Sequence, residues 1–190
     1  MSAAFWLVKW IALLFSLCLM AGTAGAEEMK MHRKQAGEPD KSGWMLAKST
    51  EGRFSVRLPL KFNDFTVTEA DPNAPAARTY TVGARSSERI AVVATRIAYR
   101  KGAAAAKEYF ARFEKGQGLG AAPESVTPRR VGPLRAVDLV LKRPTDVIYQ
   151  RVVLLDADLL LMSVEAPREH DASARELAAT FFDSLQVDAR

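Results

Sequence analysis

Hydrophobic and polar residues alternate along much of the chain after residue 44, which is the pattern of half-buried β-strands. Within residues 53–60, Phe54, Val56 and Leu58 occupy every second position. The same reasoning predicts further strands at 65–67, 78–83, 88–99, 134–142, 146–155 and 159–166. Because short turns such as 156–158 join several of these segments, neighbouring strands are expected to pair antiparallel.

Two segments change to the period of an amphipathic helix. Residues 103–115 place aromatic side chains on one face and are followed by a glycine-rich stretch that ends the helix. A second helix is predicted at 172–185. At its start, Ser173 and Glu176 have the spacing of a capping box, in which each side chain accepts a hydrogen bond from a first-turn amide.

The strand predicted at 146–155 is apolar on both faces, with Ile148 and Val152 on one and Tyr149 and Val153 on the other. A sheet with two apolar faces must be covered on both, most simply by helices. The sequence therefore predicts an α+β fold, a mostly antiparallel sheet flanked by helices in an α/β/α sandwich. Residues 44–190 are expected to form this single domain.

The first 26 residues have the features of a signal peptide. A short region with one charge precedes an apolar run at 10–21, and Ala24 and Ala26 supply the small side chains that signal peptidase accepts. Cleavage is therefore predicted after Ala26, which gives an exported, periplasmic or extracellular protein. The apolar run is shorter than the roughly 20 residues of a membrane span, although a retained anchor stays an alternative. Residues 27–43 are polar and aperiodic, and they are expected to be a flexible leader.

Charge and cysteine usage narrow the possible functions. The formal net charge is +5, and no run of five like charges occurs, so we do not expect nucleic-acid binding. The only cysteine is Cys18, inside the predicted signal peptide, where the bulky Leu17 before it disfavours lipidation. The mature chain can therefore form no disulfide and has no thiolate for catalysis or metal binding.

Few residues could carry catalysis or bind a metal. His32 lies near Met29 and Met31, a set that could hold Cu(I) but that is interpreted as solvated leader residues. His170 lies where a helix is predicted to begin and is interpreted as an exposed residue. We therefore predict no catalytic, cofactor-binding or metal-binding residue, and no cofactor.

One hypothesis concerns the basic residues of the strands, which would form an anion-attracting surface if those strands lie together. The alternative is that they are ordinary strand-edge charges, which discourage edge-to-edge aggregation. The residues of the hypothetical surface are Arg96, Arg100, Arg129, Arg130, Arg135, Lys142 and Arg143.

Several short stretches carry a family resemblance. They are Glu51-Gly52-Arg53-Phe54-Ser55-Val56 leading into Leu58-Pro59 after Trp44, Tyr109-Phe110 in the first helix, Arg135-Ala136-Val137, and Phe181-Phe182-Asp183-Ser184-Leu185. With these the chain resembles the PsbP-like and DcrB-like superfamily of small exported α/β sandwich proteins, over about residues 44–190. The resemblance implies the sandwich fold and a non-enzymatic accessory or binding role, and it transfers no binding residue to this chain.

The function expected from the sequence is that of a non-enzymatic accessory or binding module of the cell envelope. Its partner would be another envelope protein or a small ligand, and it would contact the membrane only transiently, through the signal peptide. The alternative is a carrier of a small ligand or anion, and an enzyme is the less favoured reading.

Overall fold

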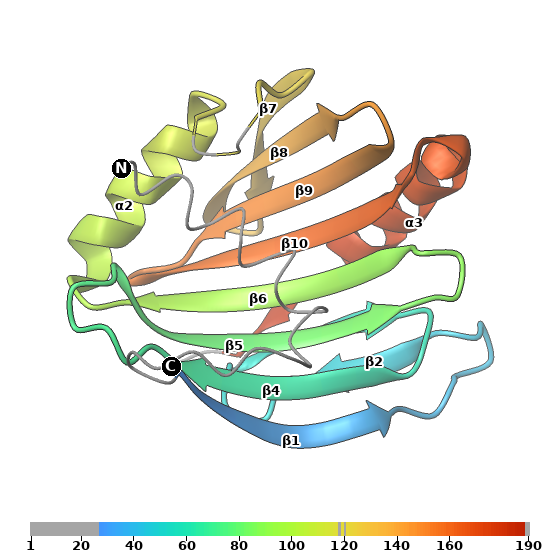
Figure 1. Ribbon diagram of the computed structural model, residues 1–190, viewed down its shortest axis with the longest axis horizontal. Coiled ribbons are helices and arrows are strands. Elements are labelled where there is room, and N and C mark those ends of the chain that lie inside the picture. The colour runs from blue at the N-terminus through green and yellow to red at the C-terminus, as the bar shows by residue number, and fades with distance from the viewer. Residues whose placement is uncertain (1–26, 118, 120, 189–190) are drawn as a thin grey trace.

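The computed structural model describes residues 27–117, 119 and 121–188, so the predicted signal peptide at 1–26 lies outside the described residues. Its main element is an eight-stranded antiparallel sheet with the strand order β1-β4-β5-β6-β10-β9-β8-β7 (Figure 1). The strands are β1 Glu28–Ala36, β4 Phe62–Thr68, β5 Ala76–Arg85, β6 Ala91–Tyr99, β7 Ser125–Val131, β8 Leu134–Lys142, β9 Asp146–Leu154 and β10 Asp158–Pro167.

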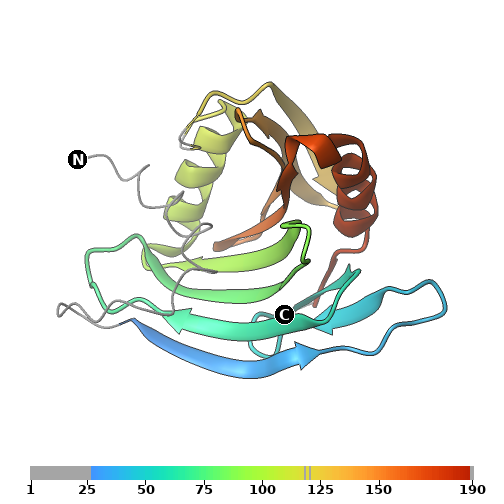
Figure 2. The same ribbon diagram turned by 45° about the vertical axis from the view of Figure 1, so that its right-hand side comes forward.

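The remaining elements cover this sheet from both sides. Helix α2 (Gly102–Glu114) packs on β6, β9 and β10, and helix α3 (Asp171–Asp183) packs on β9 and β10. The two helices lie on opposite faces (Figure 2). A small three-stranded sheet made of β2 (Met45–Lys48), β3 (Phe54–Leu58) and β11 (Gln186–Val187) shares the core on the α3 face. The chain thus has an α+β fold, as the sequence predicts.

The alternation of side chains along β9 explains why both faces need cover. Val152 is fully buried in the core that includes α2, and Val153 is fully buried in the core that includes α3. Phe110 and Phe113 anchor α2 to its face, and Phe181 anchors α3 to the other. Each of these large apolar side chains is removed from water by packing against the sheet, which stabilises both layers.

The expectation of a flexible leader at 27–43 is wrong for residues 28–36, which form β1 and pair antiparallel with β4. Most of the side chains of β1 are exposed, and the strand lies at the edge of the sheet with a neighbour on one side only. A strand exposed on both faces needs no hydrophobic alternation, so its sequence carries no periodic signal.

Two other expectations are also corrected. Strand β7 is not among the strands predicted from the sequence. It contains Pro128, which an edge strand tolerates, since the missing N–H can face away from the sheet. Helix α3 begins at Asp171, preceded by a 3₁₀ turn, so Ser173 is already inside its first turn. The Ser173 hydroxyl donates to the His170 carbonyl at 3.0 Å, and no side chain caps the first amides, so the capping box does not form.

Within the described part of the chain, none of the helices has the length and apolar character needed to cross a bilayer.

Candidate functional site

A groove lies between α3 and the strands β7, β8 and β9, with a volume of about 580 Å³. It forms because α3 packs over β9 and β10 while β7 and β8 extend beyond it. We call this feature the α3 groove. Its lining residues are Glu124, Ser125, Thr127, Arg129, Asp138, Leu139, Val140, Lys142, Tyr149, Gln150, Arg151, Arg175, Ala178, Ala179, Phe182 and Asp183.

Strand register decides which side chains reach the α3 groove. Successive residues of a strand point to opposite faces, so Ser125, Thr127 and Arg129 of β7 share one face. Thr127 is paired with Asp138 of β8, and Asp138 is paired with Arg151 of β9. A row of polar side chains therefore runs across three neighbouring strands beneath the open side of α3.

The first charged cluster of the groove is centred on Asp138. Its two carboxylate oxygens accept hydrogen bonds from Nε and Nη2 of Arg151, at 2.7 and 2.9 Å. Arg129 approaches the same carboxylate, with Nε 3.3 Å from Oδ2. Arg151 also donates to Asp183 of α3 at 3.3 Å, so the cluster links the sheet to the C-terminal end of the helix. The hydrogen bonds from Arg151 to Asp138 raise the pKa of this guanidinium above the ordinary value for arginine.

The second cluster lies at the N-terminal end of α3. Lys142 Nζ is 2.9 Å from the carboxylate of Glu124 and 3.7 Å from that of Asp171. The Tyr149 hydroxyl donates to Asp171 and accepts from Nε of Arg175 at 3.2 Å. The Tyr149 hydrogen bond and the nearby Lys142 lower the pKa of the Asp171 carboxyl. Burial and this hydrogen bond raise the pKa of Tyr149, so its hydroxyl keeps its proton at neutral pH.

The middle of the groove is lined by small apolar side chains. Val140 lies on its floor, and Ala178 and Ala179 form the wall on α3. Their methyl groups fill less space than the side chains at either end, which keeps the groove open between the two clusters. Arg151 lies 5.1 Å from the centre of the Phe182 ring, a cation–π contact that fixes the guanidinium against the helix.

This arrangement suits binding by charge and hydrogen bonds. The lining holds four cations, three carboxylates and three hydroxyls, most of them ordered by pairing across the groove. Among the described residues, no group of three or more histidine, cysteine, aspartate or glutamate side chains is placed to hold a metal ion.

The structure separates the seven basic residues of the hypothetical anion-attracting surface. Arg96 forms an ion pair with Asp158 that is nearly buried, away from the groove. Arg100 donates to two carbonyl oxygens of the β4–β5 loop. Arg135 pairs with Glu114 of α2, at 2.6 Å, on the opposite side of the sheet from α3. These three do not face a common surface.

The other four divide between the groove and its surroundings. Arg129 and Lys142 line the α3 groove, although each is paired with a carboxylate. Arg130 follows Arg129 on β7 and so points to the other face, where it donates to the Pro133 carbonyl at 3.4 Å. Arg143 is half-buried outside the groove lining. The seven therefore do not form one surface: Arg129 and Lys142 line the groove, and Arg130 and Arg135 are paired across β7 and β8 on the opposite face.

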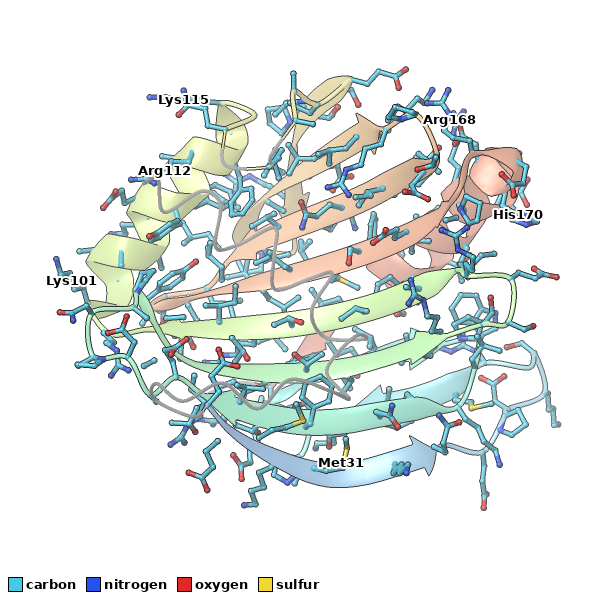
Figure 3. The ribbon with its side chains drawn as sticks, viewed as in Figure 1. Met31, Lys101, Arg112, Lys115, Arg168 and His170 are labelled. Atoms are coloured by element: carbon cyan, nitrogen blue, oxygen red, sulfur yellow. The ribbon has the colours of Figure 1, made fainter. Side chains whose placement is uncertain are left out.

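The set Met29, Met31 and His32 does not converge. The two methionines are 49% and 47% exposed on β1, where Figure 3 labels Met31, and alternation places His32 on the other face. The His32 ring instead hydrogen-bonds the Thr66 hydroxyl at 2.9 Å. His170 is half-buried beside the start of α3 (Figure 3) and does not line the groove.

Sequence reasoning missed Asp138, Tyr149, Arg151 and Arg175 as residues of one site. A signal was present, because Asp138 lies between Ala136 and Val140 on one face of β8, and Arg151 lies between Tyr149 and Val153 on one face of β9. A charge at such a position needs a partner. The pairing of β8 with β9 then places these two opposite each other.

Comparison with known proteins adds a likeness in structure. No family model matches the chain, and no curated protein sequence matches it. Among solved structures, it is similar to the crystal structure of LpqN, a protein involved in cell envelope biogenesis of Mycobacterium tuberculosis. The two are 12% identical, with a TM-score of 0.40, and the match covers 88% of this chain and 87% of LpqN. At this TM-score the likeness carries no argument about function, and the specific resemblance to PsbP-like and DcrB-like proteins stays a prediction.

Proposed function

We propose that the chain is exported and acts as a non-enzymatic binding module of the cell envelope, with the α3 groove as its binding site. Export is supported by the signal-peptide pattern of residues 1–26. The binding role is supported by the groove itself, whose walls hold ordered donors and acceptors around an apolar middle. This groove is the observation on which the proposal depends.

The exposure of the walls favours a protein segment as the occupant. The side chains of Asp183 and Arg129 are 80% and 56% exposed, so both rims of the groove face solvent. A site for a small molecule usually buries 70–90% of its ligand, which an open groove does not do. A segment of a partner protein can lie along such a groove and make contacts at both clusters.

Contacts with the partner would come from side chains and not from an added strand. Strand β7 is the free edge beside the groove, but Pro128 in its middle has no N–H to donate. An incoming strand would therefore lose a hydrogen bond at the centre of the edge.

The second candidate is a carrier of a small ligand or anion. The volume of about 580 Å³ lies within the range of small-molecule sites and favours it. Tight retention of a small molecule through purification, with its loss after Ala179→Trp, would support the carrier and count against the protein partner.

In vivo photo-crosslinking tests the proposal most directly. A photoreactive residue is placed at Ala179 in the groove wall, and the matched control carries it at Ala104, an exposed alanine of α2. We expect one partner protein to be captured from position 179 and not from 104. Equal capture at the two positions, or none at 179, would contradict the proposal. N-terminal sequencing of the exported protein tests cleavage, with Glu27 as the expected first residue.

A further inference from the structure

We propose that the Arg175 end of the α3 groove is a carboxylate subsite, which receives an acidic group from the partner protein. The inference rests on the proposed function, because it names the chemistry that the groove recognises. It starts from the geometry of three residues, Arg175, Tyr149 and Asp171.

Arg175 is held by one edge of its guanidinium. Its Nε donates to the Tyr149 hydroxyl at 3.2 Å, while the Tyr149 proton is given to Asp171. Tyr149 has a single proton, so the direction of both hydrogen bonds is fixed while Asp171 is ionised. The two Nη groups of Arg175 are left for other acceptors, and the residue lines the groove.

Arg175 differs from the other three cations of the groove. Lys142, Arg129 and Arg151 each have a carboxylate oxygen within 3.3 Å. No carboxylate oxygen of a described residue lies within 4 Å of the Arg175 guanidinium nitrogens, and its one hydrogen bond is to a neutral phenol. A guanidinium with a free Nη pair matches the two oxygens of a carboxylate in bidentate geometry.

The charges next to Arg175 favour a ligand group with one negative charge over a group with two. The carboxylates of Asp171 and Glu124 both lie within 4 Å of Lys142 Nζ at this end of the groove. Their repulsion opposes a dianionic phosphate more strongly than a carboxylate, because the energy scales with the charge of the ligand.

The rest of the groove suits the backbone and side chains that accompany an acidic residue. The hydroxyls of Ser125 and Thr127 lie on β7, and Ala178 and Ala179 leave an apolar space between the clusters. An acidic residue of a polypeptide, or its C-terminal carboxylate, can therefore reach Arg175 while the neighbouring residue lies over the alanines.

The test uses the exported protein purified from cells and defined probes. The probes are a capped Ala-Glu-Ala-Glu-Ala peptide, the matching Ala-Gln-Ala-Gln-Ala peptide and inorganic phosphate. Binding of each probe is measured from the NMR chemical shifts of the α3 amides. We expect saturable binding of the acidic peptide alone, weakened about tenfold or more by Arg175→Gln, which corresponds to about 1.4 kcal/mol. The affinity of Arg175→Lys for the acidic peptide is expected to lie between those of the unmodified protein and Arg175→Gln. Lysine keeps the positive charge but lacks the paired N–H donors of the guanidinium.

Arg130→Gln is the matched control, since it removes one positive charge from the other face of β7. We expect this change to alter the affinity for the acidic peptide by less than about twofold, because salt screens exposed charges on the far face of the sheet. The proposal is overturned if the acidic peptide gives no saturating shift, if both peptides bind alike, or if Arg175→Gln behaves as Arg130→Gln. Tighter, Arg175-dependent binding of phosphate would also overturn it.

The crosslink from Ala179 separates this inference from the proposed function. Loss of partner capture in Arg175→Gln, with capture retained in Arg130→Gln, supports the subsite. Full capture in Arg175→Gln would leave the groove as the binding site and show that the carboxylate subsite is wrong. Absence of capture in the unmodified protein would reject the proposed function itself.

Discussion

Arg96 and Asp158 form an ion pair that joins β6 to the first residue of β10. Nε of Arg96 lies 2.7 Å from Oδ2 of Asp158, and the two side chains are only 12% and 11% exposed. The same guanidinium donates to the Gly52 carbonyl at 3.0 Å, so it also holds the β2–β3 turn of the small sheet against the main sheet. One side chain thus connects the two sheets.

Removing the Arg96 side chain should therefore lower the stability of the fold substantially. Arg96→Ala leaves the Asp158 carboxylate nearly buried without its partner, and we expect a loss of about 3–5 kcal/mol in the free energy of unfolding. Arg100→Ala is the control, because this exposed arginine donates to loop carbonyls only. Urea unfolding of both variants measures the difference, and equal losses would show that the Arg96 pair has no special role.

The two carboxylates bound by Arg151 should contribute unequally to stability. Asp138 accepts two hydrogen bonds from it and is 21% exposed, whereas Asp183 is 80% exposed. We expect Asp138→Asn to lower the free energy of unfolding by about 2 kcal/mol, as for hydrogen bonds to charged groups. Asp183→Asn should cost less than about 0.5 kcal/mol, since exposed ion pairs contribute little. Denaturant titration tests this order, and the reverse order would contradict it.

Gly52 should tolerate no side chain. A Cβ there would lie 2.6 Å from the Ser49 hydroxyl oxygen, 2.7 Å from a ring carbon of Phe54 and 2.8 Å from Cβ of Tyr80. We expect Gly52→Ala to cost about 1–3 kcal/mol through overpacking. Gly83→Ala is the control, since its nearest neighbour would be a Val93 methyl at 3.1 Å, and a smaller loss is expected. Thermal unfolding compares the two variants. An equal or smaller loss for Gly52→Ala would show that the turn can relax.

Asp40 should remain ionised under acidic conditions. The Ser42 hydroxyl and amide donate to its carboxylate, with further contributions from Arg57 and Trp44, and they lower its pKa to about 2 from an ordinary 3.8. Because the pKa is lower in the folded state, ionised Asp40 stabilises the fold above pH 3.8. This stabilisation is lost as the pH falls from 3.8 towards 2.

Carbon-detected NMR titration of the carboxyl measures this pKa. We expect Asp40 to be mostly ionised at pH 3 in the unmodified protein and Ser42→Ala to move the midpoint towards 3.8. An ordinary midpoint in both proteins would contradict the role of Ser42.

The sequence was sufficient to predict the centre of the fold and insufficient at its margins. Strands β9 and β10 are largely buried on both faces and β8 on one, and burial produces the apolar runs that prediction uses. The two strands at the ends of the main sheet, β1 and β7, were missed because their mostly exposed residues are free to be polar. Short strands such as β2 and β11 depend on tertiary contacts that no local pattern records.

The candidate site was predictable only in part. Arg129 and Lys142 were among the basic residues expected to act together, and both line the groove. Their neighbours Tyr149 and Arg175 come from β9 and α3, and nothing in their local sequence indicates that they meet. That meeting depends on where α3 lies on the sheet, which follows from the packing of Phe181 and not from any motif.

The two edge strands of the main sheet, β1 and β7, also affect how the protein behaves at high concentration. An open sheet could recruit further copies at either end and grow into a fibre. At one end Pro128 removes a donor, and at the other the register of β1 shifts twice while Lys30, Arg33 and Lys34 lie along it. Polymerisation by strand addition is thereby opposed at both ends of this sheet.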